Sequence, residues 1–180
     1  LVEAWWQTLT DTDARPLRLR EPLQTFFLPE LPESVTSLAD SIGRTIAKLS
    51  PEDSAYQIGL AYTGMLPAEY RGTHGVYYTP PALTARLINQ AGEAGVDWTY
   101  ARILDPACGG GAFLTSIAQQ IIDALPDCSP SILLKNIGTR LRGYEIDPFG
   151  AWLSQVALDA VLLPLSRETG RRLPVVVTVC

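Results

Sequence analysis

The sequence predicts an α/β domain, with a partial parallel sheet flanked by helices and a helical extension in front of it. A short apolar run at Ile103-Leu104 leads through an acid and three glycines into a helical pattern. Residues 174–179, PVVVTV, are typical of a buried parallel strand. Upstream, residues 33–49 keep apolar side chains on one helical face. With 180 residues, of which 47% are hydrophobic, the chain can bury a substantial core.

The stretch Arg102–Leu114 is the most informative part of the chain. Asp105 follows the apolar run, so its carboxylate is expected at the carboxyl edge of the sheet, where open α/β sheets bind ligands. Gly109, Gly110 and Gly111 remove side chains from the turn, which allows a ligand to lie on the backbone. The following helix would carry its apolar face at Leu114, Ile117, Ala118, Ile121, Ile122 and Leu125. Its free N–H groups suit a phosphate or a carboxylate.

Two phosphate-binding motifs fit this stretch poorly. A dinucleotide fingerprint needs a third glycine where Leu114 stands, and an acid about 20 residues further on. A P-loop needs Gly-Lys-Ser/Thr, but Gly111 is followed by Ala112. A tight strand-to-helix turn without any ligand remains an alternative, because glycine-rich motifs alone are weak signals.

Charge and cysteine content restrict the partners. A net charge of −5 is unfavourable for a stand-alone DNA binder, so most contacts with DNA would come from elsewhere. Cys108, Cys128 and Cys180 show no metal-ligand spacing, and their odd number disfavours a disulfide framework. No stretch has the roughly 18 apolar residues of a membrane span, and no signal peptide is visible. We expect a cytoplasmic protein, no metal site, no membrane partner, and a chain cut from a longer one.

Residues 1–74 are interpreted as an arm followed by a helical extension. Residues 1–32 carry Trp5, Trp6, Phe26 and Phe27 without a sustained period, and could include a short first helix. Arg15, Arg18 and Arg20 are expected to be solvated or paired within the protein rather than bound to phosphates. A packing helix is expected over 33–49, capped by Ser34 and burying Val35, Leu38, Ala39, Ile42, Ile46 and Leu49. A second helix after Pro51 would bury Ile58, Tyr62, Met65 and Leu66, and the only histidine, His74, is expected to be a loop residue.

Three motifs resemble those of S-adenosylmethionine-dependent DNA methyltransferases that modify the exocyclic amine of adenine. Residues 105–114, DPACGGGAFL, resemble D-P-A-C-G-S-G-x-F-L, with Gly110 in place of the usual serine. Residues 75–80, GVYYTP, resemble the upstream motif G-x-Y-Y-T-P. Residues 143–148, GYEIDP, resemble the second motif, G-x-E-x-D-P. The resemblance implies a Rossmann-like class I methyltransferase fold over 75–180.

The resemblance also implies a set of cofactor-binding residues. Tyr77, Tyr78 and Thr79 would line the methionine end of S-adenosylmethionine, and Thr79 also suits the N-cap of the next helix. Glu145 would bind both ribose hydroxyls, because one carboxylate can accept from both, and Ile146 would lie beside the adenine ring. Asp147 is expected to cap the next helix, with Pro148 in its first turn. The remaining members of the set are Asp105, Pro106, Ala107, Cys108, Gly109, Gly111 and Phe113.

The resembling family also has an Asn/Asp-Pro-Pro-Tyr/Phe segment that holds the target amine, and this sequence contains none. We therefore expect no catalytic residue in 75–180 and an inert chain when it is tested alone. The resemblance implies a bacterial or archaeal parent enzyme that acts on adenine N6 in DNA. It would belong to a restriction-modification or phage-defence system, with specificity or restriction subunits as partners. Two alternatives remain open: a methyltransferase acting on a protein or RNA amine, and a non-catalytic nucleotide-binding module.

Overall fold

The computed structural model describes residues 1–11, 13, 16–22 and 31–180. Their elements, in chain order, are α1 (Val2–Thr10), α2 (Glu33–Ile46), α3 (Pro51–Met65), α4 (Ala68–His74), α5 (Pro81–Glu93), β1 (Ile103–Asp105), α6 (Ala112–Ala124), α7 (Pro130–Arg140), β2 (Leu141–Glu145), α8 (Pro148–Val161), α9 (Leu163–Thr169) and β3 (Val177–Val179). The mixed α/β architecture agrees with the prediction. Arg15, Phe26 and Phe27 lie outside the described residues, and so do the predictions made for them.

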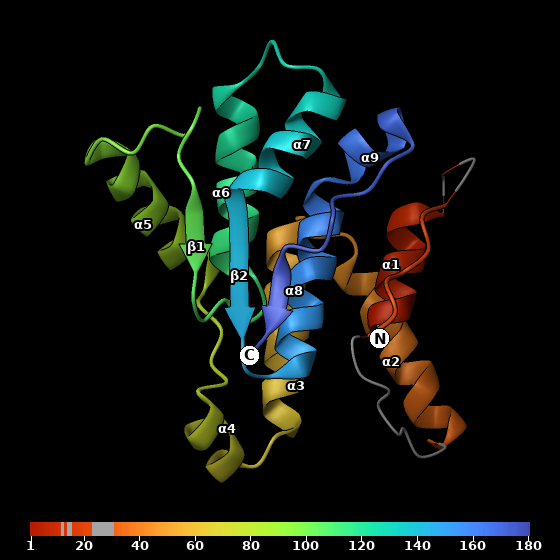
Figure 1. Cartoon of the computed structure of the whole chain (residues 1–180). Coiled ribbons are helices and arrows are strands. Elements are labelled where there is room, and N and C mark those ends of the chain that lie inside the picture. The colour runs from red at the N-terminus through yellow and green to blue at the C-terminus, as the bar shows by residue number, and fades with distance from the viewer. Residues whose placement is uncertain (12, 14–15, 23–30) are drawn as a thin grey trace.

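The sheet contains three parallel strands in the order β1-β2-β3 (Figure 1). Helices α6 and α8 both pack against β2, and α3 packs on α6 and α8. The opposite face of the sheet carries Leu104, which is 56% exposed, and Tyr144, which is 41% exposed. The expectation of fully buried strands is therefore wrong. Over 174–179 the strand begins only at Val177, and Val175 and Thr178 are exposed.

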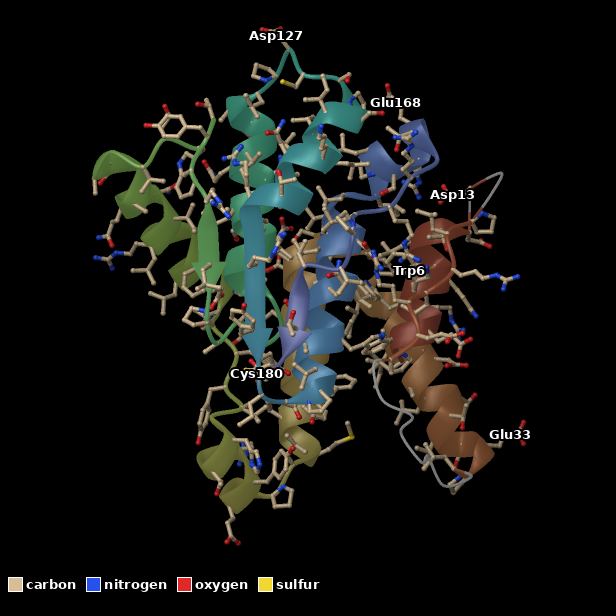
Figure 2. The ribbon with its side chains drawn as sticks, viewed as in Figure 1. Trp6, Asp13, Glu33, Asp127, Glu168 and Cys180 are labelled. Carbon is tan, nitrogen blue, oxygen red and sulfur yellow. The ribbon has the colours of Figure 1, made fainter. Side chains whose placement is uncertain are left out.

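Two clusters of buried side chains hold the helices and the sheet together. One lies between α6, α7, α8 and the strands and includes Leu114, Ile121, Ile137, Leu141 and Leu158. The other joins the amino-terminal arm to α8 through Trp5, Trp6 and Trp152. Figure 2 shows Trp6 on the side of α1 that faces α8. The first residues of the chain thus pack against the helix that follows β2.

Salt bridges reinforce this attachment of the arm. The guanidinium of Arg20 donates to both carboxylate oxygens of Asp159 on α8, at 2.5 and 3.0 Å. Arg172 donates to the same carboxylate at 2.6 Å and lies over the ring of Trp6. Pairing within the protein, as predicted from the sequence, is therefore confirmed for Arg20.

The helix over 33–49 differs from its prediction. It ends at Ile46, its N-cap is Pro32 rather than Ser34, and Val35, Leu38 and Ile42 are exposed. Its buried residues are Gly43 and Ile46, both near its carboxyl end. The packing there is close: a Cβ added at Gly43 would lie 2.4 Å from the carbonyl oxygen of Leu1. The helical period was correct, but the packed part of the face was assigned too broadly.

The helix after Pro51 matches its prediction better. Ser50 caps α3 by accepting from the backbone N–H of Asp53 at 3.1 Å, and Ile58 is buried. Met65, however, is 77% exposed, because it lies at the last position of the helix. No single helix among the described residues is long and apolar enough to cross a membrane, although the bent pair α8 and α9 meets the length and composition test together. Every described residue of α8 from Gly150 onward is buried inside the protein.

Candidate functional site

Asp105 and Glu145 end neighbouring parallel strands. β1 pairs with β2 in a register that places Asp105 opposite Gly143, and Glu145 is the last residue of β2. In Figure 1 both arrows point toward α4 and the lower end of α3. The sequence-based placement of the two acids on adjacent strands is confirmed.

Backbone amides hold the Glu145 carboxylate from two sides. The N–H of Gly109 donates to Oε2 at 2.7 Å, and the N–H of Asp147 donates to Oε1 at 2.9 Å. The side chain is only 8% exposed. Each carboxylate oxygen can accept a second hydrogen bond, so the group is fixed in place and can still accept from two ligand hydroxyls.

The glycine turn has the backbone conformation that its composition predicts. Gly109 and Gly111 have φ angles of 52° and 86°, in the left-handed region that glycine adopts without strain. Gly111 is the N-cap of α6, and a Cβ there would lie 2.5 Å from Oγ of Ser154 on α8. The absence of a side chain at Gly111 therefore allows α8 to approach the turn closely. The absence of a side chain at Gly109 leaves its backbone accessible from the cavity.

The ring of Tyr78 packs against this turn. A Cβ added at Gly109 or Gly110 would meet the ring at 3.2 or 3.0 Å, and one added at Gly59 on α3 would meet it at 2.5 Å. The phenolic oxygen is buried and has no hydrogen-bond partner among the described residues. Burial, together with nearby Asp147, raises the pKa of the Tyr78 phenol well above its ordinary value. Tyr78 thus joins α3 to the turn.

The neighbours of Tyr78 in the same motif lie differently. Tyr77 is 68% exposed. Thr79 does not cap α5, because Pro80 is the N-cap and no side chain accepts there, so that part of the prediction is wrong. Two consecutive prolines already set an extended backbone leading into a first helical turn, which leaves the threonine outside the cap position.

The carboxylate of Asp105 has one satisfied and one unsatisfied oxygen. Oδ1 accepts from the N–H of Ala107 at 3.2 Å, whereas Oδ2 is buried without a partner among the described residues. Burial raises the pKa of Asp105 above its ordinary value. An unsatisfied buried carboxylate oxygen is costly, and no donor among the described residues offsets that cost.

Cys108 is a packing residue of the turn. Its side chain is buried, and a Cβ added at Gly143 on β2 would lie 3.0 Å from its Sγ. Burial raises the pKa of the thiol to about 12, and the charges of Asp105 and Glu145 act in the same direction. The thiol is therefore protonated at neutral pH and is not a nucleophile.

A cavity of about 180 Å³ opens at the ends of β1 and β2. Seven predicted site residues line it: Tyr77, Tyr78, Pro106, Ala107, Gly109, Glu145 and Ile146. Thr79, Asp105, Cys108, Gly111 and Phe113 are not among its lining residues. A larger hollow of about 290 Å³ between α3, α5 and α6 contains neither strand-end acid. The smaller cavity is therefore the one that brings most of the predicted site residues together.

Some lining residues were not predicted from the sequence. His74, Gly75, Val76, Asp147 and Cys180 complete the cavity wall. His74 is the last residue of α4 and not a loop residue, and its ring stacks on Tyr70 with centroids 4.1 Å apart. The i, i+4 spacing of Tyr70 and His74 is the sequence feature that could have predicted this helical contact. Cys180 lies at the tip of β3 beside the end of β2 (Figure 2), where its N–H donates to the carbonyl of Glu145.

Comparisons with known proteins give a likeness of structure but no match of sequence. No family model matches the chain, and no curated protein matches it by sequence. Among solved structures, the chain is similar to the "ATP-dependent Type ISP restriction-modification enzyme LlaBIII bound to DNA", with a TM-score of 0.53 and 13% identity. The match covers 98% of this chain and 13% of that one. At this identity the likeness shows a shared fold, over a small part of the larger enzyme.

Proposed function

We propose that this chain is the cofactor-binding part of a DNA adenine-N6 methyltransferase that uses S-adenosylmethionine. One observation carries the proposal: the acid that ends β2 and the glycine turn that follows β1 line the same cavity. In open α/β sheets this is the position where nucleotide-like ligands bind. The three sequence motifs that resemble adenine methyltransferases meet in that cavity.

The residues of the cavity suit the proposed cofactor. Glu145 can accept from two vicinal ribose hydroxyls, and Ile146, which is 52% exposed, offers an apolar surface for a purine ring. Asp105 does not line the cavity itself, but it ends β1 directly before Pro106 and Ala107, which do. The bound cofactor would supply an electrophilic methyl group. Because small-molecule sites usually measure about 300–1,000 Å³, a cavity of about 180 Å³ holds only part of such a ligand.

DNA as the substrate class rests on two supports. The motifs at 75–80, 105–114 and 143–148 occur together in the DNA-modifying family that they resemble. The structural neighbour is described as a DNA-bound restriction-modification enzyme. With a net charge of −5, this chain would contribute little of the phosphate binding itself, so further DNA contacts and restriction or specificity subunits belong to the same proposal.

Titration calorimetry tests the cofactor directly. We expect the chain to bind S-adenosylmethionine in preference to NAD, and Glu145→Ala to lose most of that affinity. Glu168→Ala on α9 is the matched control, because Glu168 is exposed and lies outside the cavity. Absence of binding, or binding that is indifferent to Glu145, would overturn the proposal and favour a non-catalytic assembly module.

A further inference from the structure

The carboxylate of Asp147 receives hydrogen bonds from three different elements. Its Oδ1 accepts from the hydroxyl of Tyr62 on α3 at 3.0 Å and from the hydroxyl of Tyr70 on α4 at 3.4 Å. Its Oδ2 accepts from the N–H of Gly150 at 2.7 Å and so caps α8. The side chain is 3% exposed. A buried carboxylate with this many donors is held in one position.

Asp147 is also bonded directly to the acid of the cavity. Its backbone N–H donates to Oε1 of Glu145 at 2.9 Å, while Gly109 holds Oε2. Any displacement of Asp147 therefore rotates the Glu145 carboxylate or lengthens one of its two hydrogen bonds. Sub-ångström placement of such a group decides how well it accepts from a ligand hydroxyl.

Tyr62 is well placed to fix Asp147. Its ring packs on Phe149 at 4.1 Å between centroids, and its hydroxyl donates to Oδ1 of Asp147. Burial, and then the hydrogen bond to Asp147, raise the pKa of the Tyr62 phenol far above its ordinary value. The phenol therefore stays protonated at neutral pH and can act as a donor.

We propose that Tyr62 and Tyr70 are positioning residues that act through Asp147 to orient Glu145 toward the hydroxyl groups of a ribose. The inference deepens the proposed function and depends on it. It assigns a role in ligand recognition to α3 and α4, which both precede the motif at residues 75–80. A purely structural role, in which the tyrosines only fasten α3 and α4 to α8, is the competing explanation.

The experiment compares ligands with and without ribose hydroxyls. Adenosine and 2′,3′-dideoxyadenosine are titrated against the unaltered chain, Tyr62→Phe, Tyr70→Phe and the control Tyr100→Phe, whose phenol is 72% exposed. The Tyr62→Phe change keeps the ring contact with Phe149 and removes only the donor. We expect Tyr62→Phe to weaken adenosine binding about threefold to tenfold. A misoriented Glu145 would lose part of the free energy of a charge-assisted hydrogen bond to the ribose, and a loss of that size has this effect on affinity. Binding of dideoxyadenosine should not change, and Tyr70→Phe should have a smaller effect, because its hydrogen bond is longer.

Each outcome separates the two proposals. Equal weakening of both ligands, or no weakening of either, would overturn the positioning role while the proposed function stands. Failure of the unaltered chain to bind adenosine and S-adenosylmethionine would overturn the proposed function, and this inference with it. An NMR measurement without ligand gives a second check: the amide resonances of Asp147 and Gly109 should move in Tyr62→Phe and stay in place in Tyr100→Phe. Unmoved resonances would contradict the coupling.

Discussion

The backbone N–H of Gly109 donates to Oε2 of Glu145 across 2.7 Å, so the turn after β1 is bonded directly to the end of β2. This hydrogen bond joins two of the three motifs. It requires a carboxylate oxygen at the end of β2 and a backbone amide free of helix pairing in the turn. The fold itself therefore fixes the glycine turn relative to the end of β2.

Glu145→Gln should destabilise the fold even without ligand. An amide side chain has one accepting oxygen, so one of the two backbone N–H groups now faces an NH₂ group. We expect a loss of about 1–3 kcal/mol in the free energy of unfolding. Urea unfolding measures it, with Glu168→Gln on the exposed surface as the control. Equal midpoints for the two variants would contradict the role given to these hydrogen bonds.

Asp105→Asn should make the stability of the ligand-free protein less sensitive to rising pH than that of the parent. Burial raises the pKa of Asp105 in the folded state above its unfolded value, so the folded protein binds this proton more tightly. The contribution to stability is therefore greatest below the unfolded pKa and is lost as pH rises through the folded pKa. Urea unfolding at several values from about pH 4 to about pH 7 should show the variant gaining on the parent. A constant difference would exclude this linkage.

Gly143→Ala should be strongly destabilising. A Cβ at this position would lie 2.7 Å from Cδ1 of Leu114 and 3.0 Å from Sγ of Cys108, both buried. Overpacking of this kind costs about 1–3 kcal/mol. Gly64→Ala on α3 is the matched control, because a Cβ there meets nothing within 4 Å. Thermal unfolding should show a lower Tm for the first variant and an unchanged or higher Tm for the second.

Asp159→Ala should detach the amino-terminal arm. It removes the shared partner of Arg20 and Arg172 from a site where the aspartate is 4% exposed, leaving two arginines without their carboxylate. Breaking a buried pair costs about 3–5 kcal/mol, and somewhat less here because both arginines remain partly exposed. Limited proteolysis before residue 31 should become faster, whereas the exposed Asp127→Ala should behave like the parent. Unchanged cleavage would show that Trp5 and Trp6 hold the arm without the ion pairs.

Thiol labelling should distinguish Cys180 from Cys108. Cys180 is exposed and should react first with a maleimide. Burial raises the pKa of Cys108 to about 12, so only about one molecule in ten thousand carries that thiolate at about pH 8. Mass spectrometry should find Cys108 unlabelled until denaturant is added. Rapid labelling in the native protein would mean that the turn opens readily.

The sequence alone determined the local geometry of the site: a strand ending in Asp105, a glycine turn, a strand ending in Glu145, and Asp147 as the cap of α8. These follow from short-range patterns, and parallel strands joined by helical crossovers bring their carboxyl ends to one edge. Only the tertiary structure decided that Tyr62 and Tyr70, 85 and 77 residues before Asp147, donate to its carboxylate. It also decided that the Tyr78 ring packs on the glycines and that much of the apolar face of α2 stays exposed. Periodicity identifies a face, whereas what covers that face depends on contacts between distant segments that leave no local pattern.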